Sequence, residues 1–116
     1  MNFIGNEYLI PIFIGRSAEN KRVAARVLKV TGIRAHFFAS RFSPLDNLRY
    51  SCHKVFPFLD DLISESIVSF VDSIEEYYCP VIILCDDFAR DVVRRNSLGL
   101  ESACVAMEIE EFWENQ

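Results

Sequence analysis

Short apolar runs alternate with amphipathic stretches along the whole chain. The run Tyr8–Ile14 is apolar throughout, which is typical of a strand covered on both faces. Pro11 lacks an N–H donor, so it predicts a bulge or an unpaired position inside that strand. Further short strands are predicted at Ala35–Ala39, Cys52–Phe56, Val81–Cys85 and Ala103–Met107.

Between the strands, apolar residues recur with the spacing of helices. The first predicted helix, Glu19–Val30, carries Val23, Val27 and Val30 at i, i+4 and i+7, and we expect this stripe to be buried. Basic side chains follow the same spacing on another face of it: Arg22, Arg26 and Lys29. The other predicted helices are Asp60–Tyr77, ended by Pro80, then Phe88–Arg95 and Ile109–Trp113.

The order of these elements is β-α-β-β-α-β-α-β-α, which indicates an α/β fold with a mostly parallel sheet between two helical layers. We predict a three-layer, Rossmann-like arrangement of five strands in the order 3-2-1-4-5, with helices on both faces. Residues 1–116 are expected to form one domain. A ligand of such a sheet binds beside the carboxyl ends of strands one and four, where the strand order reverses.

Composition narrows the class of protein. The chain has 116 residues, 51% hydrophobic, and no apolar run approaches the roughly 18 residues that would cross a membrane. The first residues do not resemble a secretory signal. Four cysteines occur without a CxxC pair or zinc-finger spacing to either histidine. We therefore expect a reduced cytoplasmic protein that binds neither membranes nor metal.

The two halves of the chain differ in charge. Residues 1–59 hold nine Lys/Arg and three Asp/Glu, whereas residues 60–116 hold three and fourteen. Such a chain could bind anions with its first half or meet a copy of itself, unless the segments interleave in space and mix the charges. Nucleic-acid binding is not expected, because the isoelectric point is about 5.0 and no aromatic residues interleave the basic helix face.

The turn Gly15-Arg16-Ser17 is the first candidate site. It has one glycine of the three in a dinucleotide-binding GxGxxG, and it lacks the lysine of a P-loop. What remains is a helix N-terminus with Arg16 nearby, which suits an anion. The alternative is a tight strand-to-helix turn without a ligand.

The second candidate site is Cys85-Asp86-Asp87, at the end of the fourth predicted strand. Two acids facing the same crevice could hold a metal or an amine. The alternative is that one of them caps the following helix, as aspartate does well. No complete catalytic motif is present. The neighbouring Cys52 and His53 are not expected to form a cysteine nucleophile with its base, because adjacent residues of a strand point to opposite faces.

Taken together, the glycine turn, the aspartates Asp86 and Asp87, and the later Asn96 and Leu100 resemble a known arrangement. It is the N-terminal pre-ATP-grasp domain of carbamoyl-phosphate-synthase-like ATP-grasp ligases, a group that includes D-aspartate ligases. The resemblance covers about residues 7–114. The ATP-grasp domains, which carry the lysines for ATP and the acids for magnesium, would follow where this chain stops at Gln116.

The resemblance implies a non-catalytic accessory or remnant domain of such a ligase, without a cofactor of its own. It would bind substrate, a separate ATP-grasp chain or a copy of itself. The resemblance carries over only these ligand-binding positions: Gly15, Arg16, Ser17, Asp86 and Asp87. The alternatives are a stand-alone interaction module with no small-molecule ligand and, last, a small nucleotide-binding protein.

Overall fold

The computed structural model describes residues 8–15, 20–40, 52–58, 63–95 and 105–114. The strands are β1 (Leu9–Ile14), β2 (Ala35–Ser40), β3 (Cys52–Phe58), β4 (Cys79–Leu84) and β5 (Val105–Glu108). The helices are α1 (Asn20–Thr31), α2 (Ile63–Ser73), α3 (Asp87–Arg95) and α5 (Ile109–Glu114). No helix within these ranges is long and apolar enough to cross a membrane.

The five strands form one sheet in the order β3-β2-β1-β4-β5, and every pair is parallel. The predicted class, an α/β fold with a parallel sheet and helices, is confirmed, and the sheet has the order written from the sequence. Strand β1 pairs with β4 along its whole length but with β2 only from Ile12 onward. Pro11 therefore lies at an unpaired position on the β2 side, and no bulge forms there.

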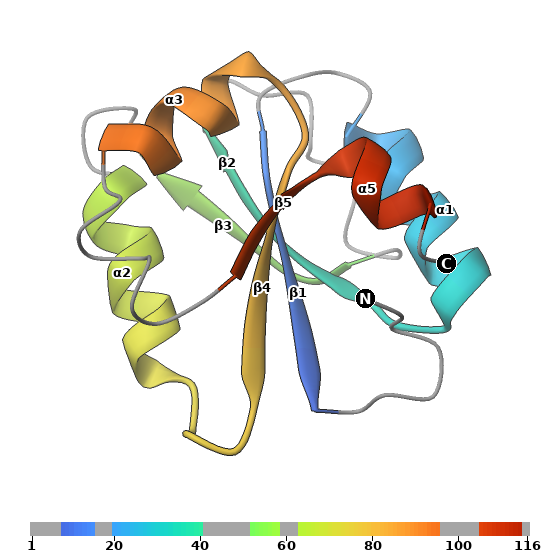
Figure 1. Ribbon diagram of the computed structural model, residues 1–116, viewed down its shortest axis with the longest axis horizontal. Coiled ribbons are helices and arrows are strands. Elements are labelled where there is room, and N and C mark those ends of the chain that lie inside the picture. Colours follow the sequence, from blue (N-terminus) through green and yellow to red (C-terminus); the bar gives the residue numbers. More distant parts are fainter. Residues whose placement is uncertain (1–7, 16–19, 41–51, 59–62, 96–104, 115–116) are drawn as a thin grey trace.

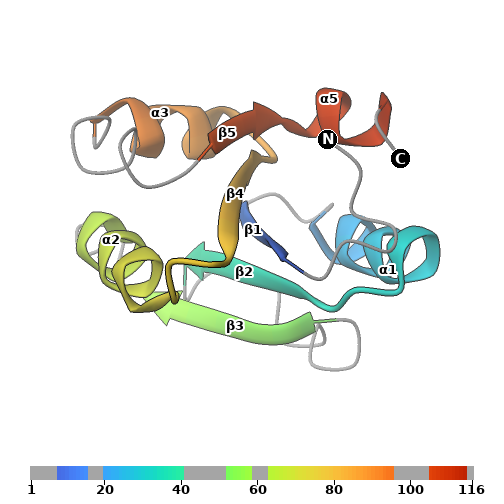
Figure 2. The ribbon, with the colours of Figure 1, turned by 60° about the horizontal axis from the view of Figure 1, so that its bottom comes forward.

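Helices cover both faces of the sheet (Figures 1 and 2). Alternate side chains of β1 point to opposite faces, so Phe13 faces one core and Ile12 and Ile14 face the other. The core around Phe13 is closed by α1 and α5, and the core around Ile12 and Ile14 is closed by α2 and α3. The result is the expected three-layer packing.

Aromatic rings fill the centre of the core beneath α1 and α5. Phe13 stacks on Phe37 with 5.1 Å between ring centroids, and Phe112 of α5 meets Phe13 edge-on at 5.5 Å. Ala24 and Val27 bring α1 against this cluster. Val30 was expected in the same stripe, but its side chain is 38% exposed because it lies in the last turn of the helix, beyond this cluster. Gly32 then ends the helix with φ of 74°.

Helix α2 is shorter than its sequence predicts. It ends at Ser73 instead of Tyr77, where the Ser73 hydroxyl donates to the Phe70 carbonyl at 2.6 Å. Strand β4 begins at Cys79, whose amide donates to the Tyr8 carbonyl at 2.7 Å. Pro80 therefore lies inside β4. The pairing of β4 with β1 outweighs the helix propensity of the glutamates before it.

Candidate functional site

The strand order reverses between β1 and β4, whose carboxyl ends lie at the upper edge of the sheet in Figure 1. At this edge the Cys85 amide donates to the Ile14 carbonyl at 3.1 Å. The Gly15 amide donates to the Phe38 carbonyl of β2 at 3.3 Å. Hydrogen bonds therefore continue across β2, β1 and β4 to the end of each strand, and the chain leaves the sheet in different directions just beyond.

The turn that begins at Gly15 offers fewer free backbone N–H groups to a ligand than the sequence suggested. Gly15 is buried, and its N–H is already used by the sheet, so it is not available for a phosphate. Arg16 and Ser17 lie outside the described residues. The sequence prediction for this turn therefore rests on the Arg16 and Ser17 side chains and on the amides that follow Gly15.

Asp86 caps helix α3. Its Oδ1 accepts a hydrogen bond from the Ala89 amide at 3.0 Å, and its carbonyl accepts one from the Arg90 amide at 3.2 Å. The capping alternative raised from the sequence is thus what the structure shows for Asp86. A carboxylate of the chain itself already occupies the positive end of α3, which disfavours a phosphate there.

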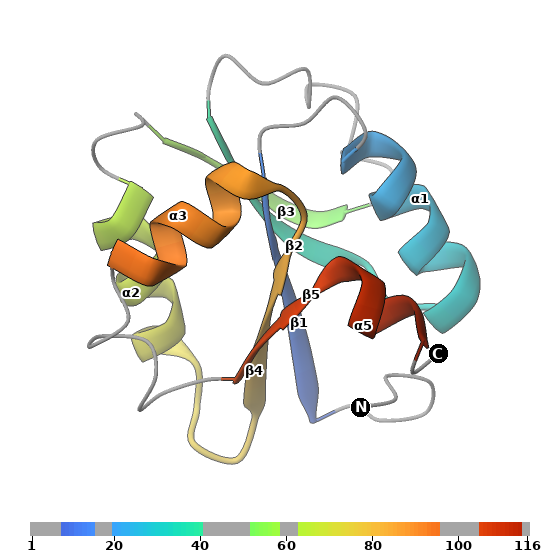
Figure 3. The same cartoon turned by 45° about the horizontal axis from the view of Figure 1, so that its top comes forward.

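Asp87 belongs to a chain of charges that the sequence analysis missed. Arg90 binds the Asp87 carboxylate at 2.5 Å and the Glu108 carboxylate at 2.9 Å, the latter with both Nε and a terminal nitrogen. The hydrogen bond with Glu108 is the largest cause that raises the pKa of Arg90 above its ordinary value. Arg90 thereby ties α3 to the end of β5, where α5 begins (Figure 3).

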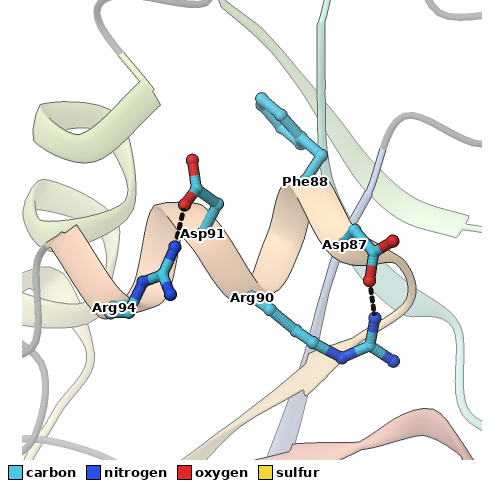
Figure 4. A pocket seen from close by; sticks show the side chains of 5 residues that line it. All are labelled: Asp87, Phe88, Arg90, Asp91 and Arg94. Atoms are coloured by element: carbon cyan, nitrogen blue, oxygen red, sulfur yellow. Dashed lines mark hydrogen bonds and ion pairs between the residues drawn. The ribbon is translucent and has the colours of Figure 1, made fainter.

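A shallow hollow of about 530 Å³ runs along the exposed side of α3 (Figure 4). The described residues that line it are Asp87, Phe88, Arg90, Asp91 and Arg94. Asp91 binds Arg94 at 2.5 Å, so each acid of the lining is paired with an arginine one turn along the helix. Asp91 is balanced by Arg94, but Arg90 is shared by Asp87 and Glu108, so one of these two carboxylate charges is not compensated, and the Asp87 side chain is fully exposed.

Cys85 lies at the switch point, in surroundings that disfavour its thiolate. Burial, followed by the neighbouring charge of Asp86, raises the pKa of its thiol well above the ordinary value. The thiol stays neutral near pH 7, and the thiolate is the form that attacks or binds metal. The described part of the chain also contains no group of three or more His, Cys, Asp or Glu side chains arranged for a metal ion.

Comparison with known proteins gives one structural likeness. No family model and no curated protein matches the chain. Among solved structures, the fold is similar to TvaF, an FMN-dependent cysteine decarboxylase from thioviridamide biosynthesis. The TM-score is 0.47 with 13% identity, over 95% of this chain and 96% of that one. Fold does not imply function, so the FMN and the cysteine chemistry are properties of that protein.

The predicted relationship to a pre-ATP-grasp domain is wrong. The chain matches no family model, and the similar solved structure is a flavin-dependent decarboxylase instead of an ATP-grasp ligase domain. The predicted role as an accessory or remnant ligase domain is corrected with it. The alternative of an interaction module without a small-molecule ligand receives no support from these comparisons either.

Proposed function

We propose that the protein binds a small dipolar molecule, of which a free amino acid is the simplest kind, at the switch point between β1 and β4. The observation that supports this proposal is the reversal of strand order there. In open parallel sheets, ligands bind in the crevice outside the carboxyl ends of the strands at such a reversal. The proposed site is lined by Gly15 and Asp86, whose N–H and Oδ1 already form hydrogen bonds within the chain, and its binding groups are Arg16, Ser17 and Asp87.

The dipolar character of the proposed ligand follows from the charges of the two turns. The turn after β1 carries Arg16 and precedes the N-terminus of α1, so it favours an anionic group. The turn after β4 carries Asp86 and Asp87, and the Asp87 side chain is fully exposed. Such a carboxylate favours an ammonium group or another hydrogen-bond donor. A phosphate bridging both turns would meet the acids of α3.

The test is a thermal-shift screen of the purified chain against single amino acids, with inorganic phosphate and methylamine as one-charge probes. A stabilising ligand raises the unfolding temperature by mass action. We expect at least one amino acid to stabilise the wild-type chain more than either one-charge probe. Arg16→Gln and Asp87→Asn should each remove most of that shift.

Asp91→Asn is the matched control, because Asp91 lies one helical turn beyond Asp87 and is paired with an arginine in the same way. It should keep the full ligand-induced shift. The proposal is wrong if no amino acid stabilises the chain, if phosphate alone stabilises it equally, or if the Asp87→Asn chain responds like the wild type.

The cytoplasmic location expected from the sequence remains part of this proposal. Its support is that Cys79 and Cys85, the cysteines whose side chains the structure describes, are both free. Free thiols persist in a reducing compartment. Fractionation of the native cells with an antibody against the chain measures this directly.

A further inference from the structure

Exposed apolar side chains gather toward one end of the sheet, opposite the proposed ligand site. Tyr8 precedes β1 and is 55% exposed, Tyr77 precedes β4 and is 61% exposed, and Val30 lies in the last turn of α1. Val105, the fourth exposed large hydrophobic side chain of the described residues, is the first residue of β5. The starts of β1 and β4 lie at the same amino-terminal edge of this parallel sheet, whereas Val105 pairs with Val81, the third residue of β4.

Charges of both signs border this apolar group without binding each other. Lys29, in the last turn of α1, and Arg34, just before β2, are exposed and form no ion pair with any described residue. On the opposite face of the sheet, Asp72 in the last turn of α2 and Glu75 and Glu76 just beyond it are exposed and likewise form no ion pair with a described residue. Basic and acidic side chains are therefore exposed at separate positions along the same edge of the sheet.

The three acidic residues line a depression in the surface. Val71, Ile74, Tyr78 and Pro80 line a depression of about 320 Å³ together with the three acids. Tyr78 packs against Tyr77 with 4.5 Å between ring centroids and against Tyr8 at 6.5 Å. Carboxylates beside aromatic rings attract a lysine or arginine side chain by charge and by cation–π contact. The depression therefore fits the end of a long basic side chain.

We infer that the amino-terminal edge is an interface between two copies of this chain. The carboxyl end of α2 lies at the lower left of Figure 1 and that of α1 at the lower right. In the proposed two-fold dimer, the acidic depression of each copy faces Lys29 and Arg34 of the other. The exposed apolar side chains then lie between the two copies. In such a dimer the same contact forms twice, and no further copy can add to it.

This partner is favoured over an unrelated basic protein because the chain carries both complementary surfaces itself. The contact also leaves the carboxyl ends of β1 and β4 free, so it does not depend on the proposed ligand site. Charge complementarity of this kind is screened by salt, because the Debye length falls from about 30 Å at 0.01 M to about 3 Å at 1 M.

The test is sedimentation velocity of the full chain in dilute buffer and at about 1 M salt. We expect a dimer in dilute buffer that dissociates at high salt. Reversal of the acidic side, Glu75→Lys with Glu76→Lys, should weaken dimerisation at least about tenfold, because like charges would then face each other. Reversal of the basic side, Lys29→Glu with Arg34→Glu, should do the same.

An equimolar mixture of the two reversed chains should dimerise again, since every contact in the mixed dimer is complementary. The matched control is Glu65→Lys with Glu110→Lys, which makes the same change in net charge at exposed positions of α2 and α5 away from this edge. It should dimerise like the wild type. Val30→Glu, at an exposed helix position, should also weaken the dimer without unfolding the chain, because it places a negative charge opposite the acidic depression.

The inference is overturned if the wild-type chain is a monomer in dilute buffer. It is equally overturned if the two reversed chains dimerise as the wild type does, or if their mixture stays monomeric while each chain remains folded by circular dichroism.

Discussion

The charged side chains at the two ends of the sheet interact in opposite ways. At the carboxyl end, Asp87, Arg90 and Glu108 bind one another, and farther along α3 Asp91 binds Arg94. At the amino end, Lys29 and Glu75 are each exposed and bind no oppositely charged described residue. Paired charges fix how the elements of one chain sit together. The charges that the described residues leave without an ion pair, of both signs and on one edge, are those that the proposed dimer uses.

The same contrast appears in the apolar residues. At the carboxyl end, Leu84, Ala89 and Val92 are packed into the core beneath α2 and α3. At the amino end, Tyr8 and Tyr77 leave more than half of their side-chain surface in solvent. Exposed aromatic side chains that lie together mark a surface for association more often than for stability. The apolar side chains at the carboxyl end are therefore part of the core, whereas those at the amino end leave apolar surface exposed to solvent.

The largest effect on the free energy of unfolding is expected in the core around Phe13, which lies between the two ends of the sheet. Phe13→Ala removes a fully buried ring that contacts Phe37 and Phe112. We expect a loss of about 3–5 kcal/mol in the free energy of unfolding, since it leaves a cavity in the middle of the sheet. Urea denaturation measures it. A loss below about 1 kcal/mol would mean that this core does not hold the two ends together.

A matched pair of substitutions compares the ends directly. Arg90→Met breaks the contacts with Asp87 and Glu108, and we expect it to lower the free energy of unfolding, because two carboxylates lose their hydrogen-bond donor. Lys29→Met breaks no ion pair among the described residues and should change stability by less than about 0.5 kcal/mol. Thermal unfolding at a concentration too dilute for dimerisation measures both. Equal losses would contradict the contrast between the ends.

The cap of α3 gives a smaller effect. Asp86→Ala removes the acceptor for the Ala89 amide and should cost about 1 kcal/mol of stability. Asp86→Asn keeps an acceptor oxygen and should cost much less. Asp72→Ala at the amino end serves as the comparison and should be close to neutral. A neutral Asp86→Ala chain would show that the carboxylate has a role other than capping.

The smallest effect concerns titration at the amino end. A hydrogen bond with Glu75, then desolvation and Tyr78, raise the pKa of Tyr77 from 10.0 to about 12. Because the folded chain holds this proton more tightly, the associated stability is complete below pH 10 and is lost as the pH rises toward 12. Phenolate absorbance, with Tyr77→Phe for assignment, measures the pKa. Glu75→Ala should lower it toward 10, and an unchanged value would contradict the assigned cause.

The sheet could be predicted from the sequence because its central strands are buried on both faces. The runs that became β1 and β4 are apolar without a break, and the intervening amphipathic stretches indicate the crossover helices that parallel strands require. The end of α2 could not be predicted, because Glu75 and Glu76 favour a helix locally. The hydrogen bond between Cys79 and Tyr8, which begins β4, depends on residues about seventy positions apart.

The candidate site could be predicted only in part, for the same reason. Capping by Asp86 is a local property, and the sequence raised it. The pair of Asp87 with Arg90 also has a local signal, an acid and an arginine three residues apart on one helix, which was overlooked. The contact of Arg90 with Glu108 has no local sequence signal, because it forms only when β5 pairs with β4.

Hydrogen–deuterium exchange of the wild-type chain, followed by mass spectrometry in dilute buffer and at about 1 M salt, tests the contrast between the two ends most directly. We predict that backbone amides of residues 29–34 and 72–79 exchange faster at high salt, because the dimer that covers them dissociates. Residues 84–90, at the carboxyl end, should exchange equally under both conditions. Faster exchange at residues 84–90, with no change at the other two segments, would contradict the account.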